Sequence, residues 1–278
     1  MVDVPGRGVT FVREVDGPPG APTVLLLHGL GATADLNWFA AFGPLGRHFR
    51  VVALDHRGHG RGSRGPGRFR LADCADDAVA LADALGIETV IPVGYSMGGP
   101  IAQLIWYRHR HRVGGLVLCA TSRNFRGRPR EQAMYATLPF MAAAARFVPG
   151  TPGRQVARLV AAPNLRKDDL RQWMQGEFDR SDMRAVIEAS HAIGRFSSHG
   201  WIGDVDVPTA VLVAQSDQLV PARRQVKLAR SIPGATTHFV DADHFAIGID
   251  PDRVVPTLVD ACRLTARRAG GRSLRLAG

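Results

Sequence analysis

The sequence of 278 residues contains few cysteines, almost no lysine and no long apolar run. Its three cysteines, Cys74, Cys119 and Cys262, include no CxxC pair and are too few for a disulfide framework, so we expect small apolar thiols in a reducing compartment. The apolar runs are about as long as a strand and far shorter than the ~20 residues that span a membrane. Charged residues interrupt residues 1–20, which therefore contain no apolar segment of a signal peptide. We expect a cytoplasmic protein without a membrane span.

The positive charge of the chain is carried almost entirely by arginine. The formal net charge is +10, and only two of the 35 basic residues, Lys167 and Lys227, are lysines. Such an excess of arginine is typical of GC-rich coding sequences, so the charge alone does not predict a specific nucleic-acid partner. From Arg263 to the end there are five arginines and no acidic residue. Basic termini that contain glycine are usually solvated, so we expect a flexible basic tail at 269–278.

Short apolar runs alternate with segments of helical periodicity over most of the chain. Hydrophobic residues make up 45% and charged residues 22%, which is typical of a globular protein. Continuous apolar strands that alternate with helices predict an α/β fold, with a mostly parallel sheet and helices on both faces. Such sheets bind ligands outside the carboxyl ends of their strands. We predict strands at 9–15, 22–28, 51–55, 89–93, 115–120, 208–214 and 236–240, and helices at 71–85, 100–110, 221–231 and 252–266.

The alternation is interrupted between residues 123 and 201. This stretch contains helical runs at 135–147 and 154–161, several prolines and no strand run. It follows the carboxyl end of a predicted strand, where ligands bind in such folds. We therefore predict a helical cap at 123–201 on a core formed by residues 1–122 and 202–268.

The segment Gly94-Tyr95-Ser96-Met97-Gly98 follows an apolar strand and precedes a helix. A serine on such a strand-to-helix turn is held in a tight conformation, and the glycines two residues before and after it leave room for the turn. The turn lifts the hydroxyl into a cleft, toward which the helix N-terminus directs its free N–H groups. These features predict Ser96 as a nucleophile.

A serine nucleophile needs a base, and the base needs an acid that orients it. In this scaffold the expected order along the chain is serine, acid, histidine. Asp217 follows the strand at 208–214 and His244 follows the strand at 236–240, so both lie in loops at the carboxyl edge. We predict Asp217 as the acid and His244 as the base. His238 and Asp243 are weaker candidates, because His238 lies within a strand run and Asp243 lies in a tight loop beside His244.

The oxyanion of a tetrahedral intermediate needs N–H donors. One should be the N–H of Met97, which follows the nucleophile, and the other should come from the loop after the strand at 22–28. Within that loop we expect the Leu30 N–H to donate and Gly29 to let the backbone approach the substrate. His28 is expected to support the loop rather than to catalyse. Among aromatic residues, we expect Trp38 and Tyr95 to contact substrate, although core packing is an equally common role for Trp38.

The motifs HGLGAT, DHRGHG, GYSMGG, SDQLVP and DADHF occur in this order along the chain. In order and spacing they resemble the α/β-hydrolase superfamily, over residues 8–268, and specifically its lidded, serine esterase- or lipase-like branch. The resemblance implies the α/β-hydrolase fold with a cap inserted after the sixth strand, and a structural rather than a chemical role for Asp55–Gly60. Dehalogenases and epoxide hydrolases of the branch carry an aspartate at the nucleophile position, where this chain has Ser96.

We therefore expect a serine hydrolase that cleaves a small carboxylic ester with an apolar or medium-chain acyl group. The alternatives are hydrolysis of an enol-lactone or a C–C bond, acyl transfer, and a non-catalytic ligand receptor on the same scaffold. We expect no cofactor, because no nucleotide-binding glycine motif is present, and no metal, because the histidine pairs 56/59 and 109/111 lack a third ligand nearby. We also expect no specific nucleic-acid partner, and a monomer or homodimer.

Overall fold

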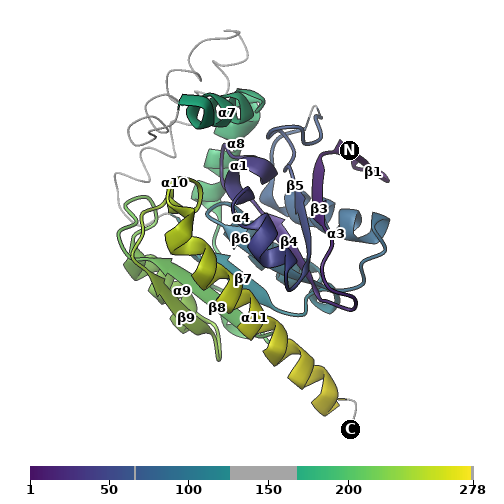
Figure 1. Cartoon of the computed structure of the whole chain (residues 1–278), viewed down its shortest axis with the longest axis vertical. Helices are drawn as coiled ribbons and strands as arrows, with labels where there is room; N and C mark the ends of the chain where they lie inside the picture. Colours follow the sequence, from purple (N-terminus) through teal and green to yellow (C-terminus); the bar gives the residue numbers. More distant parts are fainter. Residues whose placement is uncertain (66, 126–167, 277–278) are drawn as a thin grey trace.

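The core of the protein is a seven-stranded sheet (Figure 1). The computed structural model describes residues 1–65, 67–125 and 168–276. The strand order is β3-β5-β4-β6-β7-β8-β9, and all neighbours are parallel except β3 and β5. This confirms the predicted α/β-hydrolase type of fold. The strands are β3 (Val12–Val15), β4 (Thr23–Leu27), β5 (Arg50–Leu54), β6 (Val90–Tyr95), β7 (Leu116–Cys119), β8 (Thr209–Ala214) and β9 (Thr236–Val240).

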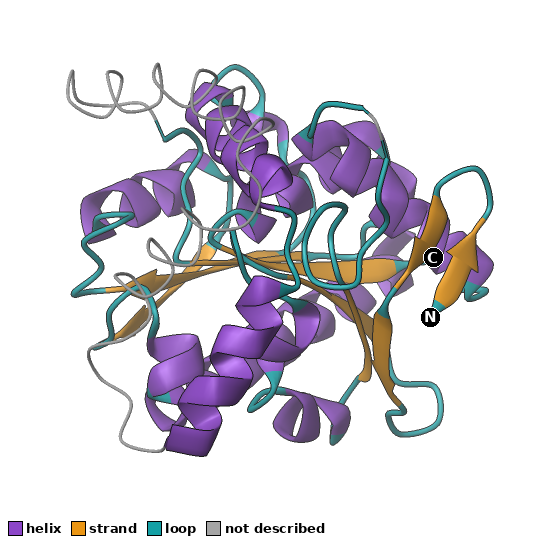
Figure 2. Ribbon diagram, turned by 90° about the horizontal axis from the view of Figure 1, so that it is seen from above, coloured by secondary structure: helices purple, strands orange, loops and turns teal. Residues whose placement is uncertain are grey.

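Helices cover both faces of the sheet (Figure 2). One face packs on α1 (Ala34–Trp38), α2 (Phe42–Gly46) and α11 (Pro251–Leu276), and the other on α3 (Leu71–Ala84), α4 (Gly98–Arg108) and α9 (Ala222–Ser231). Successive side chains of a strand point to opposite faces, so Leu25 and Leu27 belong to one apolar layer, and Val24 and Leu26 belong to the other. Burial of both faces explains why inner strands such as β4 and β8 are continuous apolar runs, whereas the edge strands β3 and β9 contain polar residues. The short helices are α10 (Ala246–Ile249), η1 (Arg110–Arg112) and η2 (Ile202–Asp204).

The three cysteines are packed within the protein as small apolar groups. Cys74, Cys119 and Cys262 are all buried and free of disulfides. Burial raises the pKa of each thiol above its ordinary value, because a thiolate loses its hydration there. The prediction of small apolar thiols near the core is confirmed.

The N-terminal region differs from the prediction of a single strand at 9–15. That segment divides at Phe11 into β2 (Gly8–Thr10), which pairs with β1 (Val2–Val4) in a two-stranded antiparallel sheet, and β3, which joins the main sheet. Helices α1 and α2 were also not predicted, because each has only five residues. β7 is the fifth strand of the main sheet along the chain, so the insert follows the fifth strand of this sheet and not the sixth.

The described part of the predicted cap is helical. It contains α7 (Asp168–Asp179) and α8 (Met183–Arg195), and Figure 1 places both at the same end of the sheet as α1. The predicted helices at 135–147 and 154–161 lie outside the described residues. The two ends of the segment lie side by side, because Asn124 pairs with Ser197 and the Ser198 N–H donates to the Arg123 carbonyl, 2.9 Å away.

The C-terminal helix is longer than predicted. α11 continues to Leu276, so residues 269–276 of the expected tail belong to this helix. Arg268 Nη2 donates to the Gly234 carbonyl at 2.9 Å, which ties the distal half of the helix to the turn before β9. Arginines near a helix C-terminus also interact favourably with its negative pole. Among the described residues, no helix combines the length and the apolar character needed to cross a bilayer.

The close packing of α4 against β4 predicts that a side chain at Gly98 destabilises the fold. A Cβ at Gly98 would overlap the Leu27 carbonyl, whereas a Cβ at Gly176 in α7 would meet nothing within 4 Å. We expect Gly98→Ala to lower the free energy of unfolding by about 1–3 kcal/mol through overpacking. Gly176→Ala should raise it by about 0.5–1 kcal/mol, because glycine is the poorer helix former. Urea unfolding of both variants measures the difference, and equal stabilities would contradict this close packing.

Candidate active site

Ser96 occupies a strained turn between β6 and α4. Its φ is +51°, in the left-handed region that a residue with a side chain seldom adopts. Three hydrogen bonds hold it there: the Ser96 N–H donates to the Cys119 carbonyl (3.0 Å), and the Ser96 carbonyl accepts from Thr121 Oγ1 (2.8 Å) and the Gly99 N–H (3.0 Å). A Cβ at Gly94 would overlap the Gly98 carbonyl, so the turn requires the glycine that the motif supplies.

The serine, histidine and aspartate form a continuous chain of hydrogen bonds. His244 Nδ1 lies 2.7 Å from Asp217 Oδ2, and His244 Nε2 lies 2.9 Å from Ser96 Oγ. Because a carboxylate only accepts, Nδ1 carries the imidazole proton, and Nε2 is left to accept from the serine hydroxyl. The three residues follow β6, β8 and β9, whose carboxyl ends meet at one edge of the sheet.

The carboxylate of Asp217 is fully buried and has every oxygen partnered. Oδ1 accepts from the N–H groups of Leu219 (2.9 Å) and Val220 (2.7 Å), and Oδ2 accepts from Gln225 Nε2 (3.1 Å) as well as from His244. The weaker candidates are occupied elsewhere in the structure. His238 bonds Thr236 Oγ1 within β9, and Asp243 Oδ1 accepts from the Phe245 N–H.

Ser96 thus lies on a strained turn between strand and helix and is hydrogen-bonded to His244, which is hydrogen-bonded to the buried Asp217. This is the arrangement that the sequence motifs predict. The sequence model described as alpha/beta hydrolase fold matches residues 22–251, which is most of the chain. This protein is an α/β hydrolase.

Proteins similar to this α/β hydrolase include several other hydrolases. Over 265 residues it is 27% identical to the poly(3-hydroxyalkanoate) depolymerase of Ectopseudomonas oleovorans, covering 94% of this chain and 90% of that protein. A thermophilic esterase from Thermogutta terrifontis superposes with a TM-score of 0.78 at 25% identity, over 92% of this chain and 94% of that one. The enol-lactonase from Burkholderia xenovorans LB400 shares the fold, with a TM-score of 0.77 at 24% identity over 91% and 96% of the two chains.

The loop after β4 brings backbone close to Ser96 of the hydrolase. A Cβ at Gly29 would lie 3.4 Å from Ser96 Cβ, and the Gly29 N–H donates to Asn37 Oδ1 at 2.9 Å. Leu30, the next residue, is 37% exposed. Met97 is the N-cap residue of α4, at the end of the helix where N–H groups lack helical partners. The loop therefore lies beside Ser96, and the oxyanion-donor roles of Leu30 and Met97 stay predictions.

Trp38 and Tyr95 lie in the core of the hydrolase, which corrects the expectation that they contact substrate. Trp38 is 0% and Tyr95 is 5% exposed, and their rings pack edge to face with centroids 6.1 Å apart. The Tyr95 hydroxyl donates to the His244 carbonyl at 2.9 Å. Both side chains therefore support the loop that carries the histidine instead of facing a ligand. Tyr95 shares one face of β6 with Ile91 and Val93, whereas the direction of the Trp38 ring depends on how α1 packs, which the sequence does not show.

Gln225 is a supporting residue that the sequence analysis missed. It is fully buried in α9, where its Nε2 donates to Asp217 Oδ2 and to the Val220 carbonyl (2.7 Å), while its Oε1 accepts from the Ala214 N–H (3.0 Å). These bonds tie the aspartate loop to the end of β8. The sequence does indicate such a role, because Gln225 lies on the same face of the predicted helix as the apolar Leu228 and Ala229. An amide buried there without hydrogen-bond partners would destabilise the fold, so it is expected to bond a nearby loop.

Three histidines form a buried cluster behind the loop after β4. The ring of His28 lies 4.3 Å from that of His56 and 5.4 Å from that of His59, measured between centroids. His28 Nδ1 donates to the Gly29 carbonyl (2.8 Å) and Nε2 accepts from the His56 N–H (2.9 Å), which is the supporting role expected for it. Burial lowers the pKa of His28 to about 4 and of His59 to about 3, and lowers the pKa of His56 well below its ordinary value. All three are therefore neutral at pH 7.

This cluster predicts a loss of stability in mild acid. An unfolded histidine takes up a proton near pH 6.5, whereas these folded histidines resist protonation until far lower pH, so unfolding binds protons and the folded state weakens as pH falls below about 6.5. Each such histidine contributes a slope of up to about 1.4 kcal/mol per pH unit. We expect His59→Gln to reduce by about that amount the slope of unfolding free energy measured between pH 6 and 5. His111→Gln, at an exposed position, is the matched control, and an unchanged slope in His59→Gln would contradict the prediction.

Proposed function

We propose that the hydrolase cleaves carboxylic esters with Ser96 as its nucleophile. The observation that carries this proposal is the pair of hydrogen bonds from Ser96 Oγ to His244 and from His244 to the buried Asp217. Ser96 Oγ attacks the ester carbonyl carbon while its proton passes to His244 Nε2, and Asp217 stabilises the imidazolium that forms. His244 then gives this proton to the leaving alcohol, which leaves an acyl group on Ser96. Water activated by the same histidine releases the acid.

The negative charge of the tetrahedral intermediate is held by backbone N–H groups in this proposal. The Met97 N–H at the start of α4 and the Leu30 N–H of the loop after β4 are the two donors. Fixed donors of this kind act without reorganisation during the reaction, and removing one typically costs a factor of about 10²–10³ in kcat. The proximity of Gly29 to Ser96 supports the assignment of this loop.

An apolar or medium-chain acyl group fits the side chains near the three catalytic residues. Acyl chains bind against apolar side chains, and several exposed apolar side chains belong to the loops that carry these residues or follow β4. Leu219, two residues after Asp217, is 60% exposed, and Phe245, the residue after His244, is 40% exposed. Leu30 and Trp173 are also partly exposed, at the neighbouring loop and on α7. The similarity to an esterase of 25% identity supports an ester substrate as well.

Covalent labelling tests the nucleophile. Intact-mass measurement after incubation with a fluorophosphonate should show one adduct on the wild type and none on Ser96→Ala. On p-nitrophenyl esters of rising chain length, Ser96→Ala should lower kcat by about four to six powers of ten while the protein stays folded. Ser216→Ala removes an exposed hydroxyl beside Asp217 and should label and turn over as the wild type does.

The outcomes separate the possible activities. Turnover with an optimum at a medium chain length supports ester hydrolysis and sizes the acyl pocket. Labelling of Ser96 without ester turnover would replace the proposal by acyl transfer or by cleavage of a lactone or C–C bond. If the wild type shows neither labelling nor ester turnover, the proposed catalytic role of Ser96 is rejected.

A further inference from the structure

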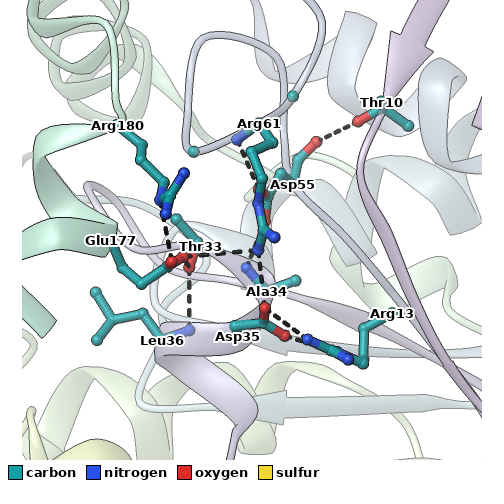
Figure 3. A network of polar contacts seen from close by, with 12 residues as sticks. Thr10, Arg13, Thr33, Ala34, Asp35, Leu36, Asp55, Arg61, Glu177 and Arg180 are labelled. Carbon is teal, nitrogen blue, oxygen red and sulfur yellow. Dashed lines mark hydrogen bonds and ion pairs between the residues drawn. The ribbon is translucent and has the colours of Figure 1, made fainter. Parts of the chain in front are cut away.

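Helix α7 of the cap carries a buried carboxylate that faces the core (Figure 3). Glu177 is 5% exposed, and its Oε2 accepts from Thr33 Oγ1 at 2.8 Å. Arg180 Nε lies 3.1 Å from Oε1, and Arg61 Nη2 lies 3.7 Å from Oε2. A buried carboxylate is stable only when paired and hydrogen-bonded, and here one of its partners is a neutral hydroxyl on the loop after β4.

The hydroxyl of Thr33 connects this carboxylate to the first turn of α1. Thr33 is the N-cap residue of α1, and its Oγ1 accepts from the Leu36 N–H at 3.0 Å. A hydroxyl has one proton to donate. Because the hydroxyl donates its hydrogen bond to Glu177, its lone pairs are left to accept from the Leu36 N–H. Through this bond, Glu177 of α7 fixes the point at which the loop after β4 ends and α1 begins.

The same loop is held from the core side by Asp55. Its Oδ1 accepts from the Ala34 N–H and its Oδ2 from the Arg61 N–H, both at 2.7 Å. The side chain of Arg61 joins the two sides, because Nη2 lies 2.8 Å from Asp35 Oδ2 and 3.7 Å from Glu177 (Figure 3). In this network three carboxylates, from Asp35, Asp55 and Glu177, face three guanidinium groups, from Arg13, Arg61 and Arg180.

A second contact from α7 reaches the middle of the loop. Gly31 has a φ of +71°, and a Cβ there would lie 2.8 Å from Phe178 Cε2. The Phe178 ring therefore covers Gly31, one residue after Leu30. Since Gly29 approaches Ser96 on the other side, Leu30 lies between a residue fixed against the nucleophile and a residue covered by the cap.

We propose that α7 positions the oxyanion-binding loop, and that Glu177 is the positioning residue through its bond to Thr33. The inference rests on the proposed function. Glu177 acts at a distance: it orders the loop whose Leu30 N–H receives the developing negative charge. An oxyanion donor must be held within a few tenths of an ångström of its place, and a displacement of about 1 Å can cost up to about 10²-fold in rate.

The cap is docked by other bonds that do not involve Glu177, so its loss should loosen the loop without detaching the helices. The Asp182 N–H donates to the Gly58 carbonyl at 2.8 Å, and the Gly60 N–H donates to Ser181 Oγ at 3.1 Å. Glu188 Oε2 accepts from the Phe69 N–H at 2.8 Å. These contacts hold the turn between α7 and α8, and α8 itself, on the loops after β5.

Kinetics of Glu177→Gln test the proposal. The carboxylate accepts from the Thr33 hydroxyl on one oxygen and faces the Arg180 guanidinium with the other. The amide keeps only one accepting oxygen, so its N–H must face either Thr33, whose hydroxyl then accepts instead of donating, or Arg180, which only donates. On the p-nitrophenyl ester that the wild type turns over best, we expect kcat per labelled active site to fall about tenfold, with KM within about twofold of the wild type. The inhibition constant of a trifluoromethyl ketone with the same acyl chain should rise by the factor lost in kcat. This ketone forms an oxyanion adduct on Ser96, whereas a purely structural role of Glu177 would change neither quantity per active site.

Variants at Thr33 test whether the effect passes through this one bond. Thr33→Val removes the hydroxyl at constant shape and should lower kcat about as much as Glu177→Gln, and the double variant should lose no more than the more severe single one. Thr33→Ser keeps the hydroxyl and should retain wild-type kcat. Asp179→Asn removes a carboxylate two residues along the same helix and should also behave as the wild type.

Several results would overturn the inference. Unchanged kcat per active site in Glu177→Gln, or additive losses in the double variant, would reject Glu177 as a positioning residue while leaving the proposed function intact. A wild type that neither reacts with the fluorophosphonate nor turns over esters would reject both. If Glu177→Gln does not fold, Thr33→Val with wild-type kcat and wild-type affinity for the ketone is sufficient to reject the inference.

Discussion

The structure around the candidate site depends on one buried carboxylate, that of Asp55. It lies at the carboxyl end of β5, and its two oxygens accept N–H groups from the loops after β4 and after β5. Burial raises its pKa, and the two backbone donors act in the opposite direction by favouring the charged form. Neighbouring parallel strands bring the two loops together, and the carboxylate then makes them one unit. That unit supplies both the backbone beside Ser96 and the surface on which α8 rests, since Ala185 contacts Gly58.

Ser96, the proposed nucleophile, is held by a different means, namely interlocked strained backbone at the ends of neighbouring strands. Ser96 after β6 and Ala120 after β7 both have positive φ, at +51° and +47°. Such residues cost about 1–3 kcal/mol each and persist only where their surroundings fix them. The Ser96 N–H donates to the Cys119 carbonyl, and the Ala120 N–H donates to the Leu212 carbonyl, so each strained residue is bonded across to the next strand. The serine is thereby placed by the sheet itself, independently of the cap.

The sequence was sufficient where function depends on topology and insufficient where it depends on long-range packing. The closeness of Ser96, Asp217 and His244 could be predicted because each follows a predicted strand, and parallel strands bring such positions to one edge. The buried position of Trp38 could not, because the direction of its ring is set by how α1 packs. The bond between Thr33 and Glu177 joins residues 144 positions apart and has no local pattern. The length of α11 was underestimated, because its distal half is held by contacts such as that of Arg268 with the turn before β9.

The segment between β7 and β8 begins and ends at one place, where Asn124 pairs with Ser197. Ser198 Oγ also donates to Gln103 Oε1 of α4 at 2.7 Å, which anchors the returning chain to the core. A segment of another length and sequence can therefore be spliced between these two points without moving either strand. The segment also supplies α7, whose Phe178 lies against Gly31 in the loop beside Ser96. Under the proposed role of this loop, a new segment would therefore bring its own reaction rate with it, and that rate would be inherited with the insert and not with the strands.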